Sequence, residues 1–190
     1  CSISNYKEAA ITLANLGYYV FRMGASVNDK FDVNHPRVFD YATNGMRTDF
    51  LDVFLGSSCT FTISNGTGFD ALPFIYKRPI LYCDHVPLSI IATFSKHFLI
   101  TTKKIWSNSK SRFLTFNEIF QSGLALDLRG EINQYDGNLA YHESNPNEIC
   151  EYVIEMHERL NNINVETEED IKLQDRFWHI FQANTDSELH

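Results

Sequence analysis

Strand-like and helix-like stretches alternate through the first half of this chain, and this alternation constrains the fold more than any other feature. A helix is expected near residues 5–16, where apolar residues recur at helical spacing before Gly17. Strands are expected at 18–23, 38–41, 59–63 and 80–83, with helices at 48–55 and 69–76. Short connections of this kind favour an α/β fold in which a Rossmann-like parallel sheet has helices on both faces.

The pattern is weaker beyond residue 90. A short strand is expected at 98–100, and a helix at 115–121 that Gly123 would end. Between them the sequence indicates a basic loop that contains Lys103, Lys104, Lys110 and Arg112. Residues 124–143 show no clear pattern.

The C-terminal end is expected to be helical. Asn145 is suited to cap a helix that begins at Pro146, and Glu148 can complete a capping box. A last helix carries Leu173, Phe177, Ile180 and Phe181 at helical spacing. The polar residues 185–190 are expected to form a frayed tail, so that residues 1–184 make a single domain.

Charge and composition exclude several classes of partner. The chain has 16 Lys and Arg against 24 Asp and Glu, and a net charge of -8 gives no overall field that attracts nucleic acid. No apolar run approaches the roughly 18–20 residues that span a bilayer, and the first residues lack a signal-peptide layout, which favours a cytoplasmic location. The chain opens without Met, which suggests a piece of a longer protein. Neither the four cysteines nor the seven histidines show metal-ligand spacing, so no metal is expected.

The most informative motif lies between the strand expected at 59–63 and the helix expected at 69–76. It consists of Ser64, Asn65, Gly66, Thr67 and Gly68, here called the glycine turn. Two glycines let the backbone approach a ligand, and the first N–H groups of the helix can bind a phosphate. An ordinary strand-to-helix turn is the open alternative. No Gly-Lys-Ser/Thr follows, and G-x-G-x-x-G is incomplete, which disfavours the P-loop and dinucleotide-binding families.

Two charged residues near the expected crevice are candidates for the same ligand. Arg22 lies at the end of the strand expected at 18–23 and can pair with a diphosphate, although an ion pair with Asp40 or Asp49 is equally compatible. Asp70, in the first turn after the glycine turn, can hold a ribose hydroxyl or simply complement the helix dipole.

Two aromatic side chains complete the set of candidates. His85 follows the strand at 80–83 and can donate to a phosphate or a sugar, or serve a structural role. Trp106, among the basic residues, can stack on a sugar or anchor its loop. No hydrolase triad is indicated, because G-x-S-x-G is absent.

Several stretches together resemble the C-terminal half of a bacterial family of surface-polysaccharide glycosyltransferases of GT-B type. These stretches are GYYVFRMG at 17–24, DFLD at 49–52, SNGTGFDALP at 64–73, RPIL at 78–81, NEI at 147–149, EM at 155–156 and FW at 177–178. The resemblance runs almost end to end. More distantly, Thr67 and Gly68, followed by Pro79, resemble the donor-phosphate turn of heptosyltransferases and of sugar-nucleotide 2-epimerases.

The resemblance implies a nucleotide-sugar donor as substrate, with its diphosphate held by backbone N–H groups without a metal or other cofactor. It also implies a glycan or lipid-linked acceptor, a location peripheral to the inner membrane, and a second domain or subunit that completes the active site. The catalytic residues stay unknown. At the spacing where the distant relatives place a His or Glu, this chain has Ala71 and Leu72. A sugar-nucleotide epimerase or hydrolase of the same fold, or a non-catalytic interaction domain, are the alternatives.

Overall fold

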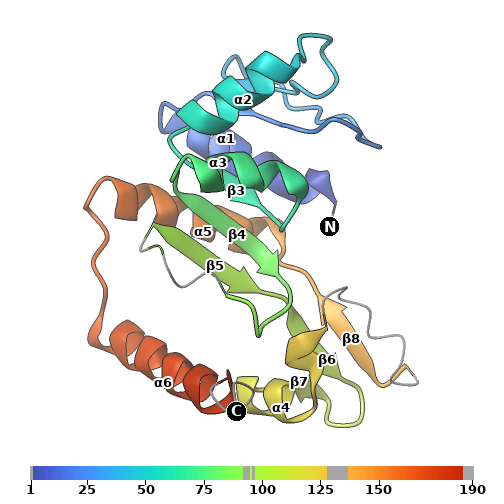
Figure 1. The fold of residues 1–190 in the computed structure, drawn as a ribbon, viewed down its shortest axis with the longest axis vertical. Coiled ribbons are helices and arrows are strands. Elements are labelled where there is room, and N and C mark those ends of the chain that lie inside the picture. The colour runs from blue at the N-terminus through green and yellow to red at the C-terminus, as the bar shows by residue number, and fades with distance from the viewer. Residues whose placement is uncertain (1, 92–94, 96, 128–136, 186–190) are drawn as a thin grey trace.

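The computed structural model describes residues 2–91, 95, 97–127 and 137–185. Helices and parallel strands alternate through its first half, so the expected α/β class is confirmed (Figure 1). In chain order the elements are η1 (Ile3–Tyr6), α1 (Lys7–Asn15), β1 (Val20–Phe21), β2 (Val38–Phe39), α2 (Asp49–Ser58), β3 (Thr62–Ser64), η2 (Gly68–Asp70), α3 (Ala71–Ile75), β4 (Ile80–His85), β5 (Phe98–Thr102), β6 (Lys104–Ser107), β7 (Arg112–Phe113), α4 (Phe116–Gln121), η3 (Leu124–Leu126), β8 (Leu139–His142), α5 (Pro146–Leu160) and α6 (Glu168–Thr185).

The central sheet is parallel and has the strand order β3-β4-β5. In its register, Leu81 of β4 lies between Ile63 of β3 and Leu99 of β5. The first four residues of β4 are buried, as expected for an apolar strand that is covered on both faces. β1 and β2 form a separate parallel pair, in which Val20 lies beside Val38. The carboxyl ends of β3 and β4 therefore lie at the same edge of the central sheet.

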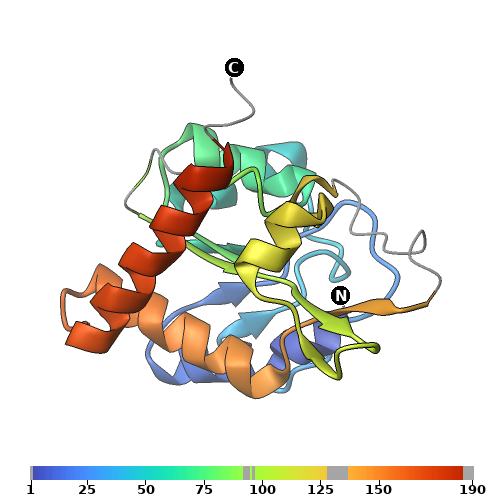
Figure 2. The same cartoon turned by 90° about the horizontal axis from the view of Figure 1, so that it is seen from below.

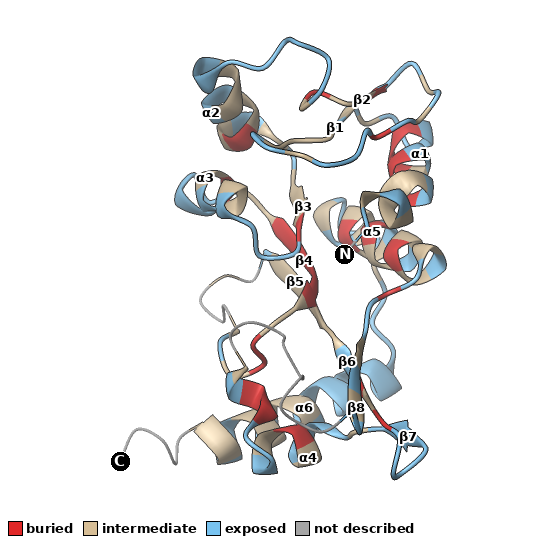
Figure 3. Ribbon diagram, turned by 90° about the vertical axis from the view of Figure 1, so that its right-hand side faces the viewer, coloured by how far each residue is buried: buried red, intermediate tan, exposed pale blue. Residues whose placement is uncertain are grey.

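Helices cover both faces of this sheet, as the sequence predicts. On one face, Leu81 and Cys83 pack against α1 and α5 through Ala9, Leu13, Ile149, Val153 and Met156. α2 and α3 lie on the opposite face, and the buried residues of this part of the core lie in β4 and on the facing sides of α1 and α5 (Figure 3). This layered arrangement is compatible with a Rossmann-like fold.

The prediction of a basic loop around Lys103 and Arg112 is wrong, because this segment forms strands. β6 is the centre of an antiparallel sheet with the order β7-β6-β8. Ile105 is buried with Ile119 and Leu124 and packs against the half-buried Tyr141, whereas Lys104 is exposed. β6 therefore has the alternating burial of a strand with one covered face.

The helices of the α2–α3 region differ from expectation. The helix expected at 48–55 does not end before Gly56: α2 continues to Ser58, and a Cβ at Gly56 would lie 2.9 Å from the Cβ of Leu72. Gly56 is thus a point of close approach between α2 and α3. The helix expected at 69–76 is divided into the 3-10 turn η2 and the five-residue α3.

The C-terminal helices form as predicted. The Asn145 and Glu148 side chains make the capping box at the start of α5. α6 packs on α4 through Phe177, whose ring centroid lies 5.0 Å from that of Phe116 (Figure 2). α6 ends at Thr185, and the rest of the expected tail, 186–190, lies outside the described residues. Over the part of the chain that is described, no helix has the length and apolarity needed to cross a membrane.

Candidate functional site

The glycine turn is folded by the side chain of its first residue. Ser64 ends β3 and is buried. Its hydroxyl donates to Asp70 Oδ2 at 2.9 Å and accepts from the Gly66 N–H at 3.1 Å. Gly66 has a φ of +83°, in the left-handed region that favours glycine, whereas Gly68 does not lie in that region. The Ser64 hydroxyl therefore shapes the turn, and both of these hydrogen bonds are made to groups of the protein itself.

The rest of the turn is open to solvent. Asn65, Gly66, Thr67 and Gly68 are exposed, and Thr67 makes no side-chain capping bond. A Cβ built on Gly68 meets no atom within 4 Å. The N–H groups of Gly68 and Phe69 open a helical stretch and have no acceptor within it. This turn can offer backbone N–H donors and the Thr67 hydroxyl to an anion.

The structure brings Asp70 and His85 to the same edge of the sheet. Burial raises the pKa of Asp70, and the Ser64 hydrogen bond and the nearby His85 ring offset only part of this effect. Because Asp70 Oδ2 already accepts from Ser64, its first role is to hold the turn together. The expected contact to a ribose hydroxyl stays a prediction.

His85 has one ring nitrogen engaged and one without a partner. Its Nε2 lies 2.7 Å from the Ile90 carbonyl oxygen, so Nε2–H is the donor in this hydrogen bond. Nδ1 is buried and has no hydrogen-bond partner among the described residues. The ring packs edge-on against Tyr82, with centroids 5.6 Å apart. Buried polar atoms are usually paired, so this nitrogen is a candidate ligand contact.

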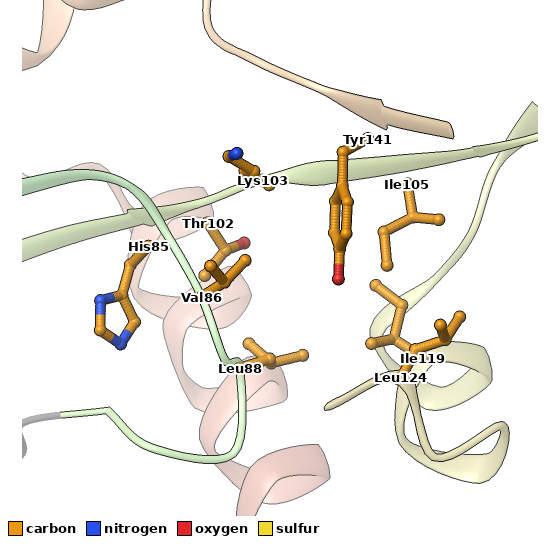
Figure 4. Close-up of a pocket in the computed structure, with 9 residues that line it drawn as sticks. All are labelled: His85, Val86, Leu88, Thr102, Lys103, Ile105, Ile119, Leu124 and Tyr141. Carbon is orange, nitrogen blue, oxygen red and sulfur yellow. The ribbon is translucent and has the colours of Figure 1, made fainter. Parts of the chain in front are cut away.

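A small pocket lies beside His85, between the end of β4 and the inner face of the antiparallel sheet. Apolar side chains such as Ile105, Ile119 and Leu124 converge there, while the His85 ring points away from them (Figure 4). Its free volume is about 10 Å³, which is enough for a single water molecule. The pocket is therefore too small for a nucleotide or a sugar.

Arg22 belongs to a different cluster. Its Nη1 lies 3.1 Å from Asp40 Oδ1, and Nη2 donates to the Asp29 carbonyl oxygen at 3.1 Å. The Arg22 and Asp40 side chains are only 10% and 14% exposed. The ion pair with Asp40 is thus the alternative that the structure contains. Contact of Arg22 with a diphosphate is still a prediction.

Asp84 is the residue at this edge that the sequence argument missed. It is 2% exposed, has a φ of +55°, and accepts from the Ser144 N–H and hydroxyl at 3.0 and 2.8 Å. These bonds tie the end of β4 to the start of α5. A polar residue directly after a buried apolar strand was the available signal.

No group of three or more His, Cys, Asp or Glu residues that could hold a metal ion occurs in the described ranges. Comparisons of this chain with protein-family models, with curated proteins and with solved structures find no match.

Proposed function

We propose that this chain is the donor-binding part of a GT-B-type glycosyltransferase that acts in bacterial cell-surface polysaccharide biosynthesis. The observation that carries the proposal is the exposed glycine turn at the carboxyl end of β3, beside the end of β4, where parallel α/β sheets bind ligands. The donor is a nucleotide-sugar, and the acceptor is a glycan or a lipid-linked saccharide. A second domain or subunit completes the active site.

The chemistry of the turn suits a diphosphate. Its oxygens can accept from the N–H groups of Gly68 and Phe69 and from the Thr67 hydroxyl, without a metal. His85 Nδ1 is the candidate acceptor for a sugar or ribose hydroxyl, and because this atom is buried, the contact requires that it is uncovered on binding. Because the net charge of the chain is -8, its overall field does not attract an anion, and local hydrogen-bond donors of this kind have to hold it.

The test is a titration of the protein with UDP, GDP, CMP and their sugar forms, followed by amide NMR shifts. We expect the amides of the glycine turn and of Phe69 to move. Gly68→Val should abolish the shifts, because its side chain would project into the open space where the phosphates bind. Its cost to folding should be small, since no atom lies within 4 Å of the added Cβ.

Ser58→Val is the matched control, because it places the same β-branched side chain at an exposed position at the end of α2, outside the glycine turn. It should bind as the wild type does. Thr67→Ala should weaken binding by roughly 1.5–3 kcal/mol, the value of a hydrogen bond to a charged group. Turn amides that stay unchanged at millimolar ligand, or unaltered binding by Gly68→Val, would contradict the proposal.

The outer surface of α2 and α3 favours a second candidate, a non-catalytic interaction domain. Phe50, Phe54 and Ile75 are 75%, 51% and 68% exposed. Apolar side chains gathered in this way often mark a protein interface. This candidate would be favoured if the chain binds no nucleotide but forms a stable complex with another protein, and if the Phe54→Ser variant does not form that complex.

A further inference from the structure

The outward face of the antiparallel sheet carries a group of aromatic rings. β6 places Trp106 between Phe113 of β7 and Ala140 of β8, and His142 lies opposite Lys104. Phe113 is 41% exposed, Ala140 and His142 are exposed, and Trp106 is half-buried. We call Trp106, Phe113, Ala140 and His142 the aromatic face. Such an outward face is usually polar in an antiparallel sheet, so this composition needs a reason.

The rings of the aromatic face are held in place before any ligand arrives. The Phe113 ring centroid lies 5.1 Å from that of Trp106 and 5.4 Å from that of His142. Trp106 Nε1–H donates to Asn108 Oδ1 at 3.1 Å, which fixes the indole. Ala140, the β8 residue opposite Trp106, is exposed and carries only a methyl group, while the His142 ring centroid lies 6.3 Å from that of Trp106. Little side-chain entropy would be lost on binding.

The sheet's own packing uses the other face. Ile105, Leu139 and Tyr141 point inward and join the cluster that contains Ile119 and Leu124. Cross-strand aromatic pairs add some stability, about 0.2–1 kcal/mol each. The large apolar side chains on the outward face are therefore additional to the core that α4 and η3 already complete.

The charges around the aromatic face select the ligand class. Lys104 pairs with Glu148, and both Lys110 and Arg112 pair with Glu118, at 2.6 and 2.7 Å. Nucleic acids and anionic membranes bind mainly through unpaired Lys and Arg. Each of these three cations is engaged with a carboxylate, and because Lys110 and Arg112 share one, the group keeps a net charge of +1. The face therefore suits an uncharged ligand better than a polyanion.

We propose that the aromatic face binds a neutral glycan by stacking of its pyranose rings. The C–H bonds on one side of a pyranose carry partial positive charge, and they pack favourably on the negative face of an aromatic ring. The hydroxyls at the ring edge can reach the polar side chains of Asn108 and His142. None of these residues belongs to the glycine turn, so this site goes beyond the donor-binding function and stands independently of it.

The test uses the whole chain and the indole N–H signals of its two tryptophans, Trp106 and Trp178. Trp178 lies in α6, with its ring centroid 5.1 Å from that of Phe177, and serves as the internal reference. The probes are maltohexaose, cellohexaose and chitotetraose, each titrated separately. We expect at least one of them to move the Trp106 signal saturably, with a Kd on the order of 1 mM, and to leave Trp178 unchanged.

Ala140→Arg covers the indole from β8 without removing a core side chain, and it should weaken glycan binding at least tenfold. Gln121→Arg adds the same side chain at an exposed position of α4 and should bind normally. Three results would overturn the proposal: no movement of Trp106 with any of the three saccharides, unchanged binding by Ala140→Arg, or tighter binding of a single-stranded oligonucleotide. Failure to bind any of UDP, GDP, CMP and their sugar forms would overturn the donor-site proposal alone.

Discussion

Ser64→Ala should destabilise the protein through the glycine turn, and the effect should depend on pH. The hydroxyl supplies a donor to the Asp70 carboxylate at 2.9 Å and an acceptor for the Gly66 N–H at 3.1 Å. A hydrogen bond to a charged group contributes about 1.5–3 kcal/mol and a neutral one about 0.5–1.5 kcal/mol. Because Gly66 is exposed and Asp70 is half-buried, water can replace part of both hydrogen bonds in the variant. We therefore take the lower ends and expect a loss of about 2 kcal/mol at pH 7.

The sign of the pH dependence follows from Asp70. Burial raises the pKa of Asp70 above its ordinary value of 3.8, and the Ser64 hydrogen bond opposes this rise. Loss of the hydroxyl should raise that pKa further. A carboxyl with a raised folded-state pKa binds its proton more tightly in the native state, so protonation stabilises the fold as pH falls through the folded pKa. The destabilisation by Ser64→Ala should thus be smaller at pH 4 than at pH 7.

Urea denaturation at both pH values measures this effect. With a slope of about 2 kcal/mol per M, the midpoint should fall by about 1 M at pH 7. Ser57→Ala is the control, because the exposed Ser57 hydroxyl bonds only the Phe54 carbonyl oxygen, and its midpoint should barely change. Equal midpoint shifts for the two variants, or a larger loss for Ser64→Ala at pH 4, would refute the reasoning.

Three further predictions concern other groups. Burial alone would raise the pKa of Asp40, but hydrogen bonds from a hydroxyl and a backbone N–H, with the charge of Arg22, lower it. The ionised Asp40 carboxylate therefore stabilises the fold fully at pH values above the usual carboxyl pKa, and this stabilisation is lost as pH falls. Asp40→Asn should cost about 1–2 kcal/mol at pH 7 and little at pH 3 in urea melts, and an equal cost at both would contradict this. Burial, with a smaller effect of Asp84, raises the pKa of Cys83 to about 12. Cys83 should therefore react with a thiol reagent at pH 8 only after unfolding, which mass spectrometry can follow. Prompt labelling of Cys83 in the native protein would be inconsistent with its burial. Ser144→Ala removes a buried donor to Asp84 and should cost about 2–3 kcal/mol in thermal melts, whereas a loss under about 0.5 kcal/mol would show that this bond contributes little.

The features that sequence reasoning predicted well are local. Asn145 and Glu148 predicted the start of α5; at α4 only the helix itself was predicted, and the structure adds the capping box of Thr115 and Glu118. In each case both partners lie within one helical turn, so the spacing alone identifies them. The apolar run that forms β4 was equally clear, because it is covered on both faces.

The features that could not be predicted depend on contacts between distant segments. Trp106 lies on an open sheet face because β6 pairs with β8, more than thirty residues later in the chain. The ion pair of Arg22 with Asp40 was decided by the pairing of β1 with β2. Within the glycine turn, the bond from the Gly66 N–H to Ser64 accompanies the left-handed backbone at Gly66, while Gly68 stays outside that region. Sequence spacing names the candidates for each role but does not choose among them.

The junction between the two sheets has a mechanical consequence. Lys103 alone separates β5 from β6, so one nearly continuous strand is the edge of the parallel sheet and the centre of the antiparallel sheet. Lys103 Nζ also lies 3.5 Å from Glu143, which follows β8. Tension applied to β8 is therefore carried along the extended backbone of β6 and β5 and then into β4. The hydrogen bonds between neighbouring strands carry this load parallel to the strands, in shear. The two sheets should yield together under force, with a single rupture event.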